Sequence, residues 1–174
     1  MELHARNEIS QVFLTSNHAS TECSALKSLT LGDTAAQSKQ ERPYFRFRGV
    51  DYFPRVNANE VPALLNQGYH FLILDVGCLD EADFSEFLRC DRKIILGNLA
   101  PWKTWKYEEF FRLFDNAINL GEGFDYLVQT GTLTKNLSYF SKSHRISLSE
   151  VPFIKNPFCI EKQLFPFLEE RLAK

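Results

Sequence analysis

Four residues that could bind a ligand lie at or just after the ends of predicted strands. Asp75 ends an apolar run, and Gly77 follows it two positions later. A carboxylate at a strand tip supplies the hard oxygen that Mg²⁺ prefers, and a glycine lets the backbone pass close to a phosphate group. Gln129 and Pro152 follow two later strands. By itself, the Asp75 pattern is more typical of a residue that caps a turn.

The elements that position these residues are short apolar runs alternating with helical segments. The predicted strands are 70–75, 92–97, 124–129 and 145–148, and the predicted helices are 81–89, 103–119, 132–141 and about 160–172. This alternation predicts βαβ units and a parallel sheet. Ligands of open parallel sheets bind at the carboxyl ends of the strands, so all four exits are expected at one rim. A continuous apolar run such as 70–75 predicts a strand buried on both faces.

The two central helices are expected to contribute apolar stripes to the core. In the longest one the stripe is Phe110, Leu113, Phe114, Ala117 and Ile118, which repeats at helical spacing. In the helix before it, Phe84, Phe87 and Leu88 are expected to face inward.

The first part of the chain is less regular. Ile9, Val12, Phe13 and Leu14 predict one face of a short helix, and the polar residues 30–43 predict a mobile surface loop. Residues 44–53 alternate aromatic and basic side chains, which predicts a two-stranded ribbon at a sheet edge with arginines facing water. Asn59 is the expected cap of a short helix that ends at Gly68.

Length and composition predict one domain with a packed core. The chain has 174 residues, 44% of them hydrophobic, and a net charge of -2, which does not predict a nucleic-acid-binding surface. We expect a single domain over 1–174, in which 44–174 form an α/β core and 1–43 is a poorly defined N-terminal segment. The sequence shows neither a signal peptide nor an apolar run of membrane-spanning length, so a cytoplasmic location is expected. The widely spaced cysteines and histidines do not predict a zinc site.

The order of the elements resembles the C-terminal two-thirds of the MinD/ParA family of deviant-Walker P-loop ATPases. Over about residues 60–174, the resemblance lies in the segments Tyr69–Gly77, Cys90–Leu96, Phe124–Gln129 and Ile146–Phe153. It implies a partial P-loop NTPase-like three-layer sandwich with a mostly parallel sheet. It also implies ATP and Mg²⁺ as cofactors, with Asp75 at the metal and switch position and Gly77 at the γ-phosphate contact. Gln129 and Pro152 fall at cofactor-binding positions, although the family usually has Asn or Asp where Gln129 stands.

The sequence departs from that family at the phosphate-binding loop. Such a loop needs glycines for its tight backbone nest and a lysine for the phosphates, and no Gly-Lys pair occurs in the sequence. The pair Gly121 and Gly123 precedes a strand instead of following one. If Met1–His4 matched the tip of the family's second strand, the first strand and its loop would lie upstream. That alignment predicts a sheet with a central gap, which leaves a strand edge to be filled by a partner.

Three hypotheses follow. The first is a MinD/ParA-like protein without its phosphate-binding loop, acting as a non-catalytic regulatory or interaction module that binds a protein partner or a second copy of itself. The second is a fragment of an active ATPase whose phosphate-binding loop is encoded upstream. The third is an unrelated α/β protein-binding domain, which would be favoured by a sheet with residues 71–75 at its edge.

Two further features of the sequence could form a surface site. Trp102, Trp105 and Tyr107 flank two lysines, Lys103 and Lys106, which is consistent with a partner-binding or base-stacking lip. Aromatic packing at the base of the long helix is the favoured interpretation. The last predicted helix mixes acidic and basic residues on its polar face, which argues against membrane targeting.

Overall fold

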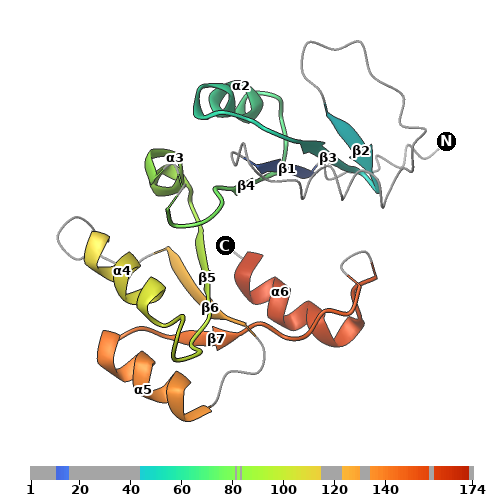
Figure 1. Cartoon of the computed structure of the whole chain (residues 1–174). Helices are drawn as coiled ribbons and strands as arrows, with labels where there is room; N and C mark the ends of the chain where they lie inside the picture. The colour runs from blue at the N-terminus through green and yellow to red at the C-terminus, as the bar shows by residue number, and fades with distance from the viewer. Residues whose placement is uncertain are drawn as a thin grey trace. The chain divides into compact units, whose positions relative to one another are not determined.

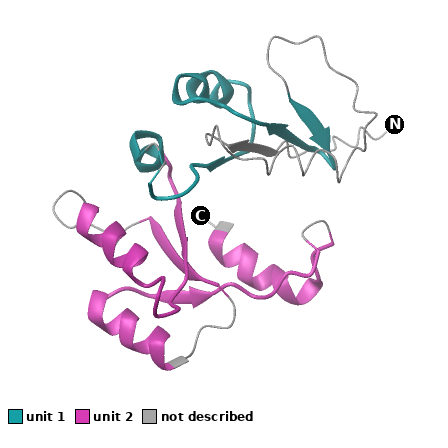
Figure 2. Cartoon of the chain, viewed as in Figure 1, with its two compact units in different colours: residues 1–89 teal, residues 90–174 magenta. Residues whose placement is uncertain are grey.

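The computed structural model describes residues 11–15, 44–80, 82, 84–114, 123–129, 134–156 and 159–172, with the backbone alone described for 11–15. The predicted loop at 30–43 lies outside these residues. The chain divides into two compact units, Met1–Arg89 (unit 1) and Cys90–Lys174 (unit 2), which Figure 2 distinguishes by colour. No helix among the described residues is both long enough and apolar enough to cross a bilayer.

Unit 1 is built on a four-stranded sheet, called sheet A, in the order β2-β3-β1-β4. Its elements are β1 (Gln11–Thr15), β2 (Phe45–Phe47), β3 (Val50–Phe53), the 3-10 helix η2 (Ala58–Glu60), α2 (Val61–Leu65), β4 (Phe71–Asp75) and α3 (Phe84–Arg89) (Figure 1). Strand β1 is parallel to both β3 and β4, whereas β2 is antiparallel to β3.

Strand β1 corrects one prediction. Residues 11–15 form a strand rather than part of a helix, because an apolar run this short fits either element and its tertiary partners decide. Strand β1 lies between β3 and β4, with Val12 opposite both Asp51 and Leu72. The described strands form two sheets, which end at β4 and at β5, so the predicted central gap stays a prediction.

Strand β4 has the predicted position in the chain but not the predicted burial. It ends the strand order of sheet A, and Phe71 and Ile73 are 39% and 48% exposed. Leu72 and Leu74, on its other face, pack against a buried cluster of Phe53, Val56, Val61 and Leu64. Among the described residues β4 is therefore covered on one face, and it is an edge strand in the order of sheet A.

The ribbon predicted at 44–53 is confirmed as the hairpin of β2 and β3. Arg48 and Gly49 both have positive φ, 51° and 79°, as the tight turn between two antiparallel strands requires. The helix that follows starts earlier than predicted, since Asn57 and not Asn59 precedes η2 and its amide N–H donates to Glu60 Oε2 at 2.9 Å. Gly68 ends this segment with φ 77°.

Unit 2 contains a three-stranded, all-parallel sheet, called sheet B, in the order β5-β6-β7. Its elements are β5 (Lys93–Gly97), α4 (Trp105–Phe114), β6 (Phe124–Val128), α5 (Thr134–His144), β7 (Leu148–Glu150), η3 (Lys162–Leu164) and α6 (Phe165–Leu172). Figure 1 shows α4 and α5 on one side of sheet B and α6 on the other. This helix-sheet-helix layering confirms the predicted α/β class.

The core of unit 2 is a cluster of aromatic side chains. Helix α4 contributes Tyr107, Phe110, Phe111 and Phe114, all buried, and they repeat at helical spacing. Phe111 lies 5.6 Å from the Tyr126 ring of β6, centroid to centroid, 6.1 Å from Phe140 of α5 and 4.6 Å from His144 of α5. Rings at these separations attract one another beyond their burial, so the cluster joins both helices to the sheet.

Some inward-facing residues were predicted wrongly. Leu113 is 52% exposed, and Leu88 of α3 is exposed while its neighbour Phe87 is buried. Ala117 and Ile118 lie outside the described residues. The last strand is also later than predicted, because α5 runs to His144 and ends at Arg145, whose φ is 55°. Strand β7 therefore begins only at Leu148.

Candidate functional site

The carboxyl edge of sheet A places the ends of β1 and β4 side by side. Thr15 and Asp75 are the paired last residues of these two parallel strands. The Asp75 carboxylate accepts a hydrogen bond from the Gly77 amide, with Oδ1 and N 2.9 Å apart. Gly77 has φ 81°, a conformation that glycine adopts without steric cost. Asp75 and Gly77 thus form one Asx turn, which is the turn-cap geometry expected for an aspartate at a strand end.

The segment that follows β1 in the sequence lacks the residues of a phosphate-binding loop. No glycine occurs between Thr15 and Gly32, and no lysine in the chain follows a glycine. Residues 16–43 lie outside the described structure. A phosphate-binding loop depends on glycines for its turns and on a lysine for charge. The segment that follows β1, the strand paired with the Asp75 strand, therefore does not have the sequence of a phosphate-binding loop.

The carboxyl edge of sheet B joins the exits of its neighbouring strands. Asn98, directly after β5, donates from Nδ2 to Oε1 of Gln129, directly after β6, at 2.8 Å. The Gln129 amide donates to the Gly97 carbonyl at 3.1 Å. Sequence reasoning missed Asn98, although a polar residue immediately after an apolar strand was the available signal. Pro152 is half-buried, two residues beyond the end of β7.

The four predicted site residues therefore fall into two groups. Asp75 and Gly77 share a turn in unit 1. Gln129 and Pro152 follow adjacent parallel strands of unit 2, where the Val151 amide donates to the Val128 carbonyl at 2.8 Å. Each group is described within its own unit. The contact partner of Gln129 is Asn98, which the sequence did not single out.

Asn98 also orders the loop that leads into α4. Its Oδ1 accepts the Ala100 amide at 2.8 Å. The Ala100 carbonyl in turn accepts the amide of Lys103 at 2.7 Å, and both the amide and the hydroxyl of Thr104 at 3.0 Å. These bonds fix the backbone between the end of β5 and the start of α4, because the amides of Ala100, Lys103 and Thr104 have acceptors within the loop.

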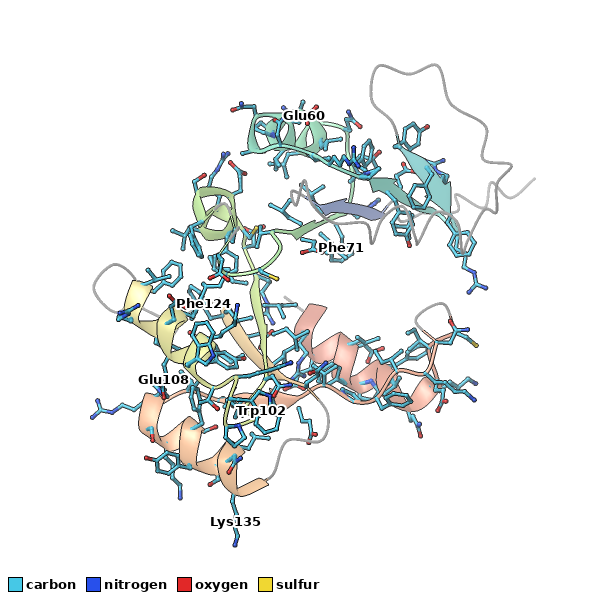
Figure 3. The ribbon with its side chains drawn as sticks, viewed as in Figure 1. Glu60, Phe71, Trp102, Glu108, Phe124 and Lys135 are labelled. Atoms are coloured by element: carbon cyan, nitrogen blue, oxygen red, sulfur yellow. The ribbon has the colours of Figure 1, made fainter. Side chains whose placement is uncertain are left out.

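Two tryptophans extend from this ordered loop into solvent. Trp102 and Trp105 are 74% and 52% exposed, so the predicted packing of these rings at the helix base is wrong. Trp105 Nε1 donates to the Trp102 carbonyl at 3.1 Å, and Lys106 Nζ lies over the Trp105 ring, 5.2 Å from its centroid. We call Trp102, Lys103, Trp105 and Lys106 the tryptophan lip; Figure 3 labels Trp102 on it.

Tyr107, the next residue, is buried and anchors the lip to the sheet. Its hydroxyl lies 2.6 Å from the Leu127 carbonyl of β6, the closer acceptor, and 3.1 Å from the Ile95 carbonyl of β5. Burial raises the pKa of Tyr107, since the charged phenolate would be desolvated. A methyl group at Gly97 would meet the Tyr107 ring at 2.1 Å, so only glycine leaves room for this contact.

Unit 1 has a buried acid of its own in Asp51 of β3. Arg46, its cross-strand partner, donates to it through two nitrogens, with Nη2 2.7 Å from Oδ2, and the Tyr69 hydroxyl donates to Oδ2 at 3.0 Å. The Arg46 hydrogen bonds hold the pKa of Asp51 below its ordinary value, and burial with the Asp51 contact raises that of Tyr69 to about 12. Because the carboxylate is fully engaged by these donors, we assign this group to stability.

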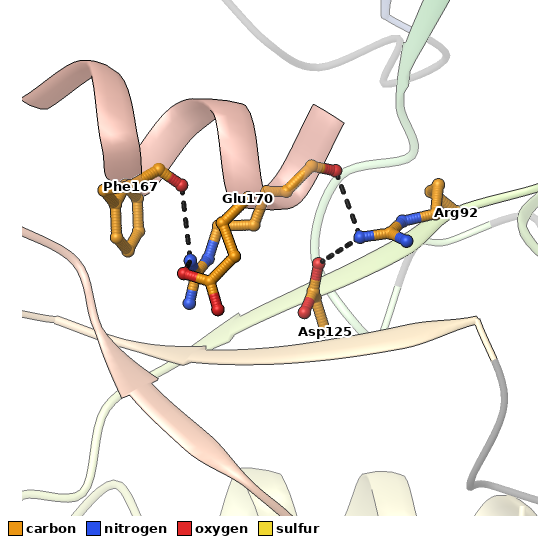
Figure 4. Close-up of polar contacts among 5 residues, drawn as sticks. Arg92, Asp125, Phe167 and Glu170 are labelled. Atoms are coloured by element: carbon orange, nitrogen blue, oxygen red, sulfur yellow. Dashed lines mark hydrogen bonds and ion pairs between the residues drawn. The ribbon is translucent and has the colours of Figure 1, made fainter. Parts of the chain in front are cut away.

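A second charged group lies at the amino end of sheet B. The Arg92 guanidinium donates to Asp125 Oδ2 at 3.3 Å and to the Arg171 carbonyl at the end of α6 at 3.2 Å (Figure 4). Arg171 is itself buried; it donates to the Phe167 carbonyl at 3.2 Å and pairs with Glu170. This group fixes α6 to the sheet at the edge opposite the strand exits.

Comparisons with known proteins give a structural likeness. No family model matches the sequence, and no curated protein matches it. Among solved structures, the MinD cell division protein of Aquifex aeolicus aligns with a TM-score of 0.50 and 12% sequence identity, over 92% of this chain and 73% of that chain. At that identity the likeness concerns the fold alone. The chain therefore has a distant P-loop NTPase-like fold, as the order of its elements predicts.

One feature of unit 1 agrees with the third hypothesis instead. Strand β4 ends the order of sheet A, and an edge position for residues 71–75 is what an unrelated α/β domain would show. The alignment with MinD nevertheless spans most of the chain, including residues of both units. The likeness is thus not confined to one unit, and function must be argued from the sites.

Proposed function

We propose that this chain is a MinD/ParA-like protein that has lost phosphate binding and acts as a non-catalytic regulatory or interaction module. The observation that carries the proposal is the sequence context of β1. A strand paired with the Asp75 strand is present, yet the sixteen residues that follow it contain no glycine. This combination favours a site without a phosphate-binding loop, because the strand paired with the Asp75 strand is not followed by one and no lysine in the sequence follows a glycine.

The Asp75 turn supports the same proposal. A Mg²⁺ ion at a nucleotide site typically takes one or two carboxylates and completes its shell with phosphate oxygens and water. Here one carboxylate oxygen of Asp75 accepts the Gly77 amide, which holds this side chain in the turn. Without a lysine and glycines to bind phosphates, this turn fits a structural cap better than a Mg²⁺–ATP centre.

The cofactor-binding positions in unit 2 offer a similar argument. The Gln129 side chain is engaged with Asn98, so reading an adenine base would require that contact to break. Breaking a hydrogen bond without replacement costs about 1 kcal/mol. We therefore propose that ATP and Mg²⁺ bind weakly or not at all, and that the partner is another protein or a second copy of the chain.

Calorimetric titration of the full chain with Mg²⁺–ATP and Mg²⁺–ADP tests the proposal. We expect no binding tighter than about 10 μM, which corresponds to about 7 kcal/mol, and no rise in melting temperature at millimolar nucleotide. Asp75→Ala should leave the titration unchanged. The matched control is Asp80→Ala, which removes an exposed carboxylate from the same loop.

Tight binding that disappears in Asp75→Ala but persists in Asp80→Ala would contradict the proposal, since it would show a working metal and phosphate site. Tight binding that persists in Asp75→Ala would show that nucleotide binds at another site in the chain. That result would also contradict the proposal that nucleotide binding is lost.

A further inference from the structure

The tryptophan lip combines exposed aromatic surface with an ordered backbone. Trp102 and Trp105 are the two tryptophans of the chain, and both project into solvent from one loop. Monomeric proteins rarely leave adjacent large aromatic side chains exposed unless they bind something. The loop bonds around Ala100 and the buried Tyr107 hydroxyl hold these rings in place, so a ligand would bind without the cost of ordering the loop.

The charge of the lip indicates the kind of ligand. Lys103 and Lys106 alternate with the two tryptophans and are both exposed, so each aromatic ring has a cation next to it. No acidic residue lies among the four, and the first acid after them is Glu108. A ligand that covers the rings would therefore bind more tightly if it carried carboxylates on either side of the part that contacts them.

A third exposed aromatic residue leaves the same edge of sheet B. Phe153 is 76% exposed and follows Pro152 at the exit of β7. Because β5, β6 and β7 are parallel, the loops after β5 and β7 depart from one edge. Phe153 is therefore a further exposed aromatic side chain at the edge of sheet B from which the loop of the lip departs.

We propose that the tryptophan lip is the docking surface for an acidic segment of a protein partner that carries an apolar side chain. This inference rests on the proposed function, for which it names the contact surface. Tryptophans supply much of the affinity at protein interfaces, and the lysines select against basic segments. A nucleic acid fits the lip less well, because stacking proteins line a long basic groove, whereas this chain has a net charge of -2.

Fluorescence anisotropy with labelled synthetic peptides tests the inference on the full chain. The probes are a peptide of glutamates flanking Leu-Phe, the same peptide with lysines in place of glutamates, and an oligothymidylate. We expect the acidic peptide alone to bind, more weakly as salt is raised, and to shift the tryptophan emission, which reports on the lip because both tryptophans are in it.

Variants then locate the binding. Trp102→Ala and Lys103→Glu should each weaken the acidic peptide by about tenfold or more, as expected for an interface anchor and a charge reversal. The matched controls are Tyr139→Ala and Lys142→Glu, which alter an exposed aromatic residue and an exposed lysine on α5, and they should bind normally. Circular dichroism of each variant confirms that the chain is folded.

Several outcomes would overturn the inference. Absence of acidic-peptide binding, equal binding of both peptides, or binding of oligothymidylate alone would each exclude the proposed ligand. Self-association that Trp102→Ala abolishes would identify a second copy as the occupant instead. Asp75→Ala separates this test from that of nucleotide loss, since peptide binding should be unchanged in that variant whether or not nucleotide binds.

Discussion

The two units of this chain differ in their buried side chains, because unit 1 buries an acid whereas the core of unit 2 is aromatic and its buried charge is that of Arg171. Unit 1 keeps a charge inside, where Asp51 is 2% exposed and is held by Arg46 and Tyr69. Unit 2 has an aromatic cluster around Phe111 and pins its sheet with the Tyr107 hydroxyl. The stability of unit 1 therefore depends on an ionised side chain, and that of unit 2 depends on how its rings pack. Acid should affect unit 1 more, and mutations that leave a cavity should affect unit 2 more.

The largest expected effect comes from removing the centre of the aromatic cluster. Phe111→Ala should lower the free energy of unfolding of unit 2 by about 3–5 kcal/mol, the usual cost of deleting a buried phenylalanine ring. Tryptophan fluorescence during urea unfolding measures this, because both tryptophans lie in unit 2. Leu113→Ala on the exposed side of α4 is the control and should cost far less. Equal losses in the two variants would show that the cluster does not hold unit 2 together.

A smaller effect is expected from overpacking the contact between β5 and α4. Gly97→Ala should destabilise unit 2 by about 1–3 kcal/mol, because its Cβ would lie 2.1 Å from the Tyr107 ring and that ring is fixed by its hydroxyl. The same substitution in a Tyr107→Ala background should cost little, since the obstructing ring is gone. If Gly97→Ala lowers the stability equally in both backgrounds, the contact with the Tyr107 ring is not the cause of the loss.

The smallest effect is expected at Asp51, and it is the one that depends on pH. Asp51→Asn should lower the stability of unit 1 at neutral pH by about 1–2 kcal/mol, the scale for disrupting a buried hydrogen-bonded group. The folded pKa of Asp51 lies below its unfolded value. Its contribution is therefore fully present above the unfolded pKa of about 3.9 and is lost as the pH falls through the folded pKa.

Hydrogen exchange of the full chain, followed separately in the peptides that come from each unit, tests this difference between the units in acid. Unit 1 of the unmodified chain should lose protection below pH about 4, and Asp51→Asn should show less of this acid loss. Alkali should affect both units, because the pKa values of Tyr69 in unit 1 and Tyr126 in unit 2 are both raised to about 12. A raised folded pKa contributes stability below the unfolded value, which is lost as the pH rises through the folded one. Acid loss of equal size in both units would break the comparison.

The sequence predicts the later elements well and the burial of single residues less well. The apolar runs that became β4, β5 and β6 are recognisable because they are short, continuous and bounded by polar residues. Residues 11–15 are an apolar run of the same kind, but their partners β3 and β4 come much later in the chain. Periodicity cannot identify such a strand, since helix and strand fit equally well over this length.

The sequence of α4 contains two overlapping apolar stripes, and spacing alone does not show which of them faces the core. Phe110 and Phe114 belong both to the predicted stripe and to the observed one, and the observed stripe turns toward Tyr107 and Phe111 instead of Leu113. Similarly, the Asn98–Gln129 contact depends on which strands become neighbours, and the exposure of Trp102 depends on what covers it. These are properties of packing that local spacing does not contain.

The contact between Arg92 and the end of α6 affects how unit 2 can fold while the chain is being synthesised. Its guanidinium contacts the Arg171 carbonyl, 79 residues later in the chain. A ribosome delivers all three strands of sheet B, with α4 and α5, before that carbonyl exists. During this interval the side of β6 that α6 later covers, which includes Leu127, has no helix against it. Nascent chains with such an exposed apolar face are prone to aggregation, so we expect unit 2 to depend on chaperones until its last helix emerges.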